Sequence, residues 1–178
     1  MQHWVFGYGS LIWRVDFPYH ERHRAAVRGW CRRFWQGSHD HRGLPHAPGR
    51  VVTLVREPDA VCIGAAYRVE EAVFEHLDHR EKNGYERVSV TMQLAREGCS
   101  ETTKKTVDGV TYIAAPGNEA FLGPADVDEM ARHIARSSGP SGTNADYLLE
   151  LAAALDDLGC EDHHVRDLVC RVRTATDQ

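Results

Sequence analysis

Apolar and polar residues alternate along much of the first two-thirds of this chain of 178 residues. The clearest stretch is residues 88–94, where Val88, Val90, Met92 and Leu94 alternate with mostly polar side chains. A period of two predicts a strand that buries one face. The same pattern and short apolar runs predict further strands over residues 4–8, 27–35, 50–55, 63–69 and 110–115.

Helical spacing occurs once among these strands and then dominates the C-terminal third. Over residues 70–82, Val73, Leu77 and Glu81 recur at every fourth position, so they share one face of a helix. The pair Asn83-Gly84 is expected to end that helix, because glycine is common just beyond a helix C-terminus. Later apolar stripes predict helices from residue 124 to a break at 137–142, from a cap at Thr143 or Asn144 to Leu158, and over residues 163–173.

Strands come first and helices second, which favours an α+β fold over one in which strands and helices alternate. A chain of this length suits one domain and can bury roughly two-thirds of the surface of its unfolded form. The sequence contains no internal repeat, no low-complexity tract and no linker long enough to separate domains. We therefore expect a single domain over residues 1–178.

Charge and composition exclude several classes of protein. The formal net charge of −5 argues against a nucleic-acid partner, because such proteins usually carry a basic excess or a basic face. The basic stretch at residues 22–35 has a simpler interpretation, a strand in which Trp30 and Phe34 face inward and charged neighbours are solvated. No secretory leader and no long apolar run are present, so we expect a cytoplasmic protein without membrane contact, and the five widely spaced cysteines are expected to be reduced thiols.

The first expected strand runs into a short glycine-rich turn. The segment consists of Val5, Phe6, Gly7, Tyr8, Gly9 and Ser10. Glycines let backbone N–H groups approach a small ligand without a Cβ in the way, and the following Leu11-Ile12-Trp13 supplies an apolar wall. The alternative is that these glycines serve turn geometry alone.

Glu81 is the strongest candidate for chemistry. If the face that it shares with Val73 and Leu77 is buried, burial raises the pKa of its carboxyl toward that of a general base. The alternative is an exposed glutamate paired with Arg80 or Lys82. The eleven histidines raise the question of a metal site, but the groups at residues 39–46 and 76–79 lack further ligands at the right spacing, so we expect none.

Several short motifs follow one another along nearly the whole chain. The two longest are FGYGSLIW at residues 6–13 and LDHREKNGYERV at residues 77–88, and the others occupy residues 33–38, 40–43, 48–54, 122–125 and 139–142. Together they closely resemble the ChaC-type γ-glutamylcyclotransferases. The family pattern usually has two glycines where this chain has Asn83-Gly84.

The resemblance implies a γ-glutamylcyclotransferase-like fold, a small mixed β-barrel with helices around it and a helical C-terminal part. It also implies that glutathione is cleaved to 5-oxoproline and Cys-Gly, without a metal or organic cofactor, when the glutamyl α-amine attacks its own γ-carbonyl. Glu81 is then the general acid and base. The residues expected to bind the γ-glutamyl group are Val5, Phe6, Gly7, Tyr8, Gly9, Ser10 and Leu11, with Tyr147 as an additional contact.

Several alternatives stay open from the sequence. Tyr147 can equally be a core aromatic beside Leu148 and Leu151. Arg42 or Arg50 is a candidate partner for the carboxylate of the Cys-Gly end. The chain can also be a cyclotransferase for another γ-glutamyl amine, or a γ-glutamyl binding or regulatory module without activity on the same barrel.

Overall fold

The computed structural model describes residues 1–95 and 105–176. These residues form two compact units, of which the first comprises Met1–Cys31 and Leu54–Ile113 and the second comprises Arg32–Thr53 and the chain from Ala114 onward. The expectation of a single domain over residues 1–178 stays a prediction. Cys99, one of the cysteines expected to be a thiol, lies outside the described residues.

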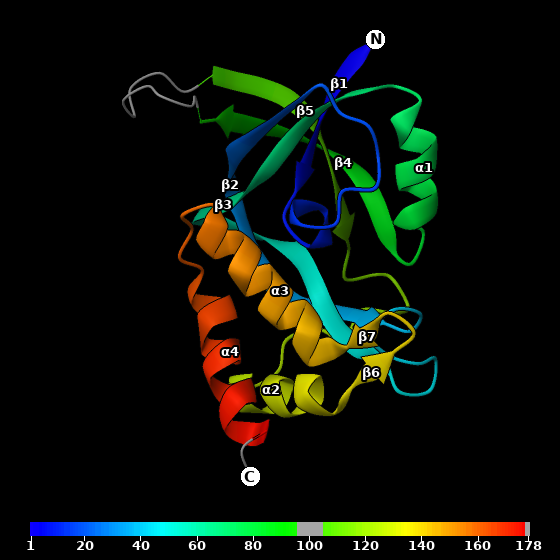
Figure 1. Cartoon of the computed structure of the whole chain (residues 1–178), viewed down its shortest axis with the longest axis vertical. Helices are drawn as coiled ribbons and strands as arrows, with labels where there is room; N and C mark the ends of the chain where they lie inside the picture. Colours follow the sequence, from blue (N-terminus) through cyan, green and yellow to red (C-terminus); the bar gives the residue numbers. More distant parts are fainter. Residues whose placement is uncertain (96–104, 177–178) are drawn as a thin grey trace. The chain divides into compact units, whose positions relative to one another are not determined.

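The strands close into a barrel in the order β1-β3-β2-β4-β5 (Figure 1). β1 pairs antiparallel with β3 and parallel with β5, where Val5 lies opposite Val110. The barrel is therefore mixed, as the resemblance to the ChaC-type family implied. Its strands are β1 (Gln2–Gly7), β2 (Glu21–Ser38), β3 (Gly49–Glu70), β4 (Tyr85–Leu94) and β5 (Lys105–Ala114).

Alternation along the strands determines which side chains are buried. In β4, Val90, Met92 and Leu94 are buried, whereas Ser89 and Thr91 are exposed, so the predicted period of two is confirmed. Two helical segments complete this part of the chain: the 3₁₀ helix η1 (Ser10–Ile12) follows β1, and α1 (Val73–Arg80) connects β3 to β4.

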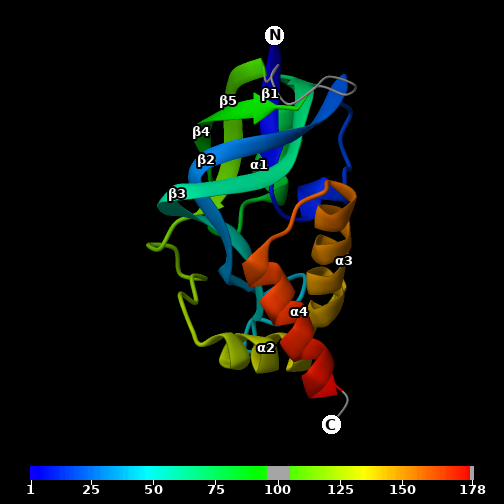
Figure 2. The same ribbon diagram turned by 90° about the vertical axis from the view of Figure 1, so that its left-hand side faces the viewer.

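Helices form most of the second unit. α2 (Val127–Arg136), α3 (Asn144–Asp157) and α4 (His163–Thr176) contact one another (Figure 2). The short strands β6 (Ser138–Gly139) and β7 (Gly142–Thr143) lie between α2 and α3 in the chain (Figure 1). The helices bury Ile134, Leu148, Leu151, Leu155 and Leu168. The predicted helical C-terminal part is confirmed.

Thr143 is the N-cap of α3. Its hydroxyl accepts a hydrogen bond from the Asp146 N–H, and the Asp146 carboxylate accepts one from the Thr143 N–H. This capping box decides between Thr143 and Asn144, the two caps that the sequence allowed. The Asn144 side chain is buried and instead bonds both the N–H and the C=O of Arg50.

Two element boundaries predicted from the sequence are wrong. β3 is one strand of 22 residues rather than two strands separated by a loop. Residues 56–59 of this strand are exposed, so Pro58, which has no N–H to donate, is tolerated there. α1 ends at Arg80, earlier than predicted, and Gly84 takes the positive φ of 84° in the turn that leads to β4.

The buried side of β2 changes along its length. Ala25 and Val27 are buried at odd-numbered positions, but Trp30, Arg32 and Phe34 are buried at even-numbered ones. The change falls at Gly29, whose φ of 78° is open to glycine at little cost. The expectation that every charged residue of this strand is solvated is wrong for Arg32, which is 1% exposed and pairs with Asp162 at 2.5 Å.

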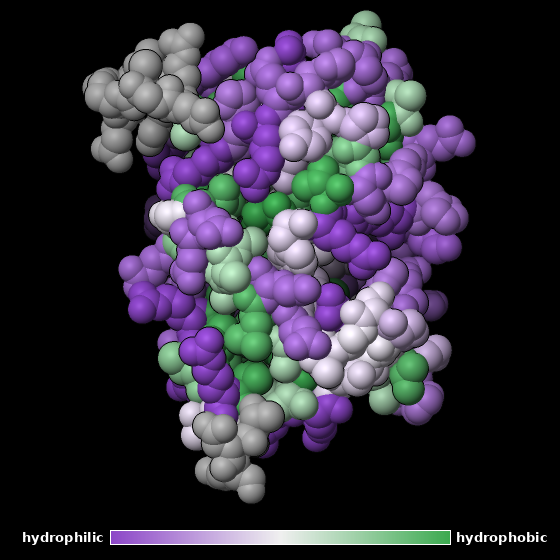
Figure 3. Space-filling view, in the orientation of Figure 1, coloured by the Kyte–Doolittle hydropathy of each residue, from purple (hydrophilic) through white to green (hydrophobic). Residues whose placement is uncertain are grey.

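Exposed large apolar side chains occur on both units, for example Val61 on the first and Leu122 on the second. Figure 3 shows apolar residues at the surface over α3 and α4, and Leu149 of α3 is among the exposed large apolar residues. Of the helices in the described part of the chain, none is both long enough and apolar enough to cross a membrane.

Candidate active site

The glycine turn that the sequence singled out leaves β1 and folds back on itself. A Cβ at Gly7 would lie 2.7 Å from the Leu11 Cβ, so no larger residue fits there unless the turn shifts. The turn then continues into η1, and both Leu11 and Ile12 are buried. Gly7 therefore serves the geometry of the turn, which is the alternative that the sequence left open for this position.

The buried Tyr67 and the exposed Arg22 both bond carbonyl groups of η1. The Tyr67 hydroxyl donates to the Leu11 carbonyl at 2.7 Å, and burial raises the pKa of this tyrosine, so the hydroxyl keeps its proton. Arg22 donates to the Tyr67 hydroxyl at 3.2 Å and to the Ile12 carbonyl at 3.3 Å. The turn is thus fixed before any ligand arrives.

Tyr112 of β5 connects the turn with α1. Its carbonyl accepts a hydrogen bond of 2.6 Å from the Tyr8 hydroxyl, and its own hydroxyl donates to Asp78 of α1 at 2.5 Å. Burial and this bond to Asp78 both raise the pKa of Tyr112. Because Tyr8 and Asp78 both bond Tyr112, the glycine turn and α1 lie close to each other.

Glu81 lies at the C-terminal end of α1, where its N–H donates to the Leu77 carbonyl at 2.9 Å. Its side chain is 17% exposed, on the face that also buries Val73 and Leu77. Burial raises the pKa of the Glu81 carboxyl, Arg80 opposes this shift, and Asp16 adds to it. The predicted shelter and the predicted direction of the pKa are confirmed. The alternative is wrong about exposure, although the contact with Arg80 that it allowed is present.

The Arg80 guanidinium brings the turn and Glu81 together. One of its terminal nitrogens donates to the Ser10 hydroxyl at 3.0 Å, and its Nε lies 3.4 Å from Oε1 of Glu81. The other terminal nitrogen donates to Asp16 at 2.5 Å and to the Arg14 carbonyl at 3.0 Å. A carboxylate with a raised pKa therefore lies beside the glycine turn.

Sequence reasoning missed several members of this site. Asp78 lay inside a motif that it quoted but received no role, and Arg80 entered only as a possible surface partner of Glu81. Asp16, Tyr67 and Tyr112 gave no local signal, because each reaches the site from a segment distant in sequence from the turn or from Glu81.

Tyr147 belongs to the second unit. Its ring is buried, meets Phe34 edge-on at 6.0 Å between ring centroids, and lies under the guanidinium of Arg42 at 5.7 Å. These contacts fit the core role that the sequence also allowed. The binding role of Tyr147 stays a prediction.

Arg42 and Arg50, the candidate partners for a substrate carboxylate, also belong to the second unit. Arg42 donates to the Thr143 carbonyl and pairs with Glu150, while Arg50 donates to the carbonyls of Phe34 and Gly123. Both guanidiniums thus have partners within their own unit, and a role for either in binding the Cys-Gly end stays a prediction.

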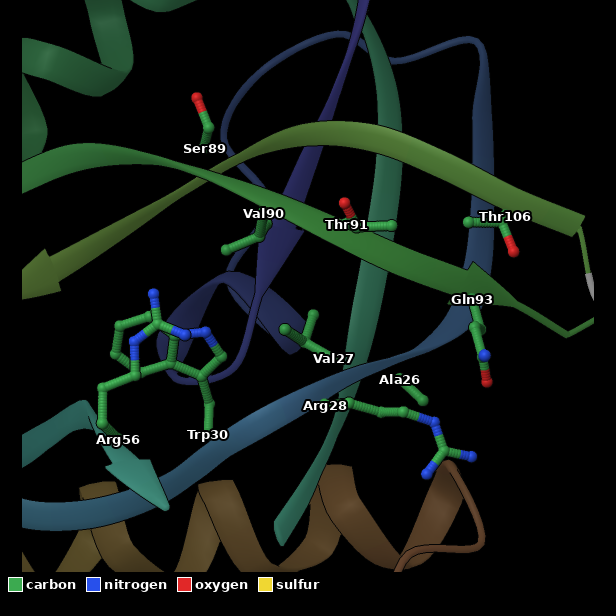
Figure 4. Close-up of a pocket in the computed structure, with 10 residues that line it drawn as sticks. All are labelled: Ala26, Val27, Arg28, Trp30, Arg56, Ser89, Val90, Thr91, Gln93 and Thr106. Carbon is green, nitrogen blue, oxygen red and sulfur yellow. The ribbon is translucent and has the colours of Figure 1, made fainter. Parts of the chain in front are cut away.

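A cavity of about 360 Å³ lies elsewhere in the first unit, where Val27 and Trp30 of β2 and Val90 of β4 are among the residues that line it (Figure 4). The Arg56 guanidinium lies 3.9 Å above the ring of Trp30 at one side of it. The lining contains arginines, hydroxyls and an amide but no carboxylate. A general base is therefore missing from this cavity, and it is not the candidate active site.

Metal ligands do not converge in the described part of the chain. Within residues 1–95 and 105–176, no three His, Cys, Asp or Glu side chains are close enough together to hold an ion. Of the histidines considered from the sequence, His76 pairs with Asp16 at 3.3 Å and His41 contacts Ser141 at 3.0 Å.

Solved structures identify the fold. The crystal structure of a yeast γ-glutamyl cyclotransferase specific to glutathione matches with a TM-score of 0.89 and 34% sequence identity, over 97% of this chain and 96% of that one. The barrel and its helices therefore have the γ-glutamylcyclotransferase fold.

Sequence comparisons identify the family. The family model for ChaC-like protein matches residues 3–175. The similar proteins include γ-glutamylcyclotransferase 2-3 of Arabidopsis thaliana, which is 42% identical over 97% of this chain and 89% of its own length. They also include human glutathione-specific γ-glutamylcyclotransferase 1, which is 37% identical over 96% of this chain and 78% of its own length. The chain belongs to the ChaC-like family.

Proposed function

We propose that this chain is a γ-glutamylcyclotransferase that cleaves glutathione to 5-oxoproline and Cys-Gly, with Glu81 as the general acid and base. The family and the names of its similar members support the substrate. One observation of the structure supports the residue: a sheltered carboxylate is held by the same guanidinium that binds Ser10 of the glycine turn.

The reaction closes a ring within one substrate molecule. The glutamyl α-amino nitrogen forms a bond to the γ-carbonyl carbon, and the bond from that carbon to the cysteinyl nitrogen breaks. The α-ammonium loses two protons in all, and the departing nitrogen gains two, so no water is consumed. Since nucleophile and electrophile belong to the same molecule, the protein has to bend the substrate, move protons and stabilise an oxyanion.

Burial of Glu81 suits this proton transfer. An α-ammonium with a pKa near 8 and an ordinary glutamate with a pKa near 4.3 differ enough to make the transfer uphill by roughly 5 kcal/mol. Each unit by which burial raises the pKa of Glu81 removes about 1.4 kcal/mol of this deficit. The same carboxyl can return a proton to the amine of Cys-Gly, which is otherwise a poor leaving group.

The turn supplies the proposed binding groups. The first N–H groups of a helical turn have no acceptor within the helix, and those near Gly9, Ser10 and Leu11 can hold the α-carboxylate or the γ-oxyanion. The residues that lead from β1 into the turn are Val5, Phe6, Gly7 and Tyr8. Tyr147 is retained as an additional proposed contact of the substrate. The proposal includes a cytoplasmic location, a reaction without metal or organic cofactor, and no nucleic-acid partner.

The test is incubation of the purified chain with glutathione while 5-oxoproline and Cys-Gly are measured. We expect both products in equal amounts, and a fall in kcat of at least about a hundredfold in Glu81→Gln, the usual scale for loss of a general base. Because the ionised carboxylate accepts the proton, the rate should rise with pH through the pKa of Glu81, which lies above the ordinary 4.5.

Glu75→Gln is the matched control, because Glu75 is an exposed glutamate on the same helix. It should leave the rate unchanged. An undiminished rate in Glu81→Gln contradicts the mechanism. A parent chain that is inert toward glutathione but converts another γ-glutamyl amine supports the second substrate class, and a chain that binds glutathione without turnover supports the binding module.

A further inference from the structure

The Arg80 side chain has four partners drawn from separate segments. Ser10 belongs to η1, Arg14 and Asp16 belong to the segment between η1 and β2, and Glu81 is the C-cap residue directly after α1. The Arg80 and Glu81 side chains are only 15% and 17% exposed, so their contact is sheltered, whereas Asp16 is 42% exposed and its pair with Arg80 lies partly in solvent. A surface arginine with a single ion pair would not have this arrangement.

Guanidinium geometry explains why an arginine stands here. Its nitrogens lie in one rigid plane, so the groups that they bind are fixed relative to one another. In this structure Nη2 meets Ser10, Nη1 meets Asp16 and Nε meets Glu81. A lysine ammonium is a single point of charge and cannot span the same three directions.

Asp16 limits what the cation does to Glu81. A lone arginine beside a carboxylate makes it a weaker base, because the positive charge favours the ionised form. Asp16 lies closer to the guanidinium than Glu81 does, at 2.5 Å against 3.4 Å, and its negative charge acts on Glu81 in the opposite direction. The pair Arg80 and Asp16 can thus hold Glu81 in place with little loss of basicity.

We propose that Arg80 is the positioning residue of this site: it fixes the Glu81 carboxylate beside the glycine turn, and Asp16 is the counter-ion that preserves the basicity of Glu81. The catalytic meaning of this inference rests on the proposed function, whereas the electrostatic arrangement does not. The titratable and charged groups around Glu81 are Arg80 from α1, Asp16 from the segment before β2, and Tyr112 from β5. His76 acts through Asp16, and Asp78 acts through Tyr112.

Two variants should move the titration of Glu81 in opposite directions. Arg80→Met removes the cation that opposes protonation, so the pKa of Glu81 should rise. Asp16→Asn removes the carboxylate that favours protonation, so the pKa of Glu81 should fall. Carbon NMR of the Glu81 carboxyl measures both shifts without any need for activity, and the acidic limb of the rate profile should move in the same sense.

The kinetic effects separate positioning from charge. In Arg80→Met, kcat should fall by at least about tenfold and by more than KM rises, because misplacing a reacting group by about 1 Å can cost a hundredfold. Arg80→Lys keeps the charge but not the planar fork, so its Glu81 titration should stay near that of the parent while kcat stays low. Lys82→Met is the matched control, because Lys82 is the exposed cation that follows Glu81 in the sequence. This variant should change neither the pKa of Glu81 nor kcat.

Several outcomes overturn the inference. Full activity in Arg80→Lys shows that charge alone matters, and Glu81 shifts of the same sign in Arg80→Met and Asp16→Asn show a loss of structure only. If Arg80→Met does not fold, Asp16→Asn and Ser10→Ala carry the test: the first should still lower the pKa of Glu81, and the second should lower kcat. Failure of the proposed function is a separate result, since it is seen as a parent chain without turnover whose Glu81 titration still responds to Asp16→Asn.

Discussion

At the scale of single residues, the candidate site depends on close contacts in the glycine turn that a larger side chain would disrupt. Gly7 lies against Leu11 where the turn folds back, and the Leu11 carbonyl in turn accepts from the buried Tyr67 hydroxyl. A substitution that moves this turn also moves Ser10 away from Arg80. Packing at Gly7 is thereby linked to the position of Glu81, the proposed base.

Gly7→Ala tests this link. The new Cβ would lie 2.7 Å from the Leu11 Cβ, so the turn has to shift. We expect kcat/KM toward glutathione to fall at least about tenfold, and the free energy of unfolding to fall by about 1–3 kcal/mol, as for other overpacked sites. Steady-state kinetics and urea unfolding measure the two effects.

Gly117→Ala provides the comparison, because a Cβ there meets no atom within 4 Å and its backbone is not left-handed. It should leave kcat/KM unchanged and change the free energy of unfolding by less than about 1 kcal/mol. Equal effects in the two variants would refute the link between the turn and the site.

Sequence reasoning reached part of this site, and the physical reason is local periodicity. Glu81 could be assigned to a buried face because Val73 and Leu77 precede it at helical spacing. The partners that tune it could not be found this way, because Asp16 and Tyr112 come from segments whose approach is set by barrel closure. Tyr67 is likewise one of many apolar positions in β3 until the structure shows what its hydroxyl bonds.

At the scale of elements, the second unit depends on how α4 meets the residues of β2 in that unit. The Phe34 N–H donates to Nε2 of His164 at 3.1 Å, and the buried Arg32 pairs with Asp162 just before α4. The histidine must be neutral at Nε2 to accept this bond. Burial, together with the nearby Arg33, lowers the pKa of His164 to about 4.

The second unit should therefore lose stability in mild acid. As the pH falls below about 6.5, the unfolded chain binds a proton at position 164 and the folded chain does not until the pH nears 4. Between about pH 7 and about pH 5 this residue should cost about 2 kcal/mol of the free energy of unfolding. Urea unfolding at a series of pH values measures the loss.

His164→Gln should remove this part of the pH dependence, because glutamine does not titrate. His163→Gln is the matched control, since His163 is the exposed neighbour on the same helix and should keep the slope of the parent. A His164→Gln protein whose stability falls as steeply as that of the parent over this pH range would contradict the assignment.

Elements with strong periodicity were predicted well, and those that depend on tertiary cover were not. The apolar face of α2 and the N-cap of α3 depend on residues close together in the sequence, so a local pattern predicts them. The middle of β3 is not, because residues 56–59 carry charges and a proline that read as a loop, and only pairing within the barrel keeps the strand continuous. The burial of Arg32 likewise depends on Asp162, which lies 130 residues further along the chain.

At the scale of the whole molecule, two strands run through both compact units. β2 passes from the first unit to the second after Cys31, and β3 passes from the second to the first after Thr53. Continuity of these strands supports the proposal of a single domain over residues 1–178.

This proposal predicts one cooperative unfolding transition, in which a core truncation in either unit destabilises both. Leu77 in the first unit and Leu168 in the second are both fully buried, so Leu77→Ala and Leu168→Ala should each lower the free energy of unfolding by about 2–5 kcal/mol.

Calorimetry of the parent and of both variants should show a single peak whose calorimetric and van't Hoff enthalpies agree. Tryptophan fluorescence comes mainly from the first unit, which holds Trp4, Trp13 and Trp30 while Trp35 lies in the second. It should give the same midpoint in each variant as far-ultraviolet circular dichroism, to which the helices of the second unit contribute most. Two peaks, of which each truncation moves only its own, would instead show two independently folding domains joined by the strands.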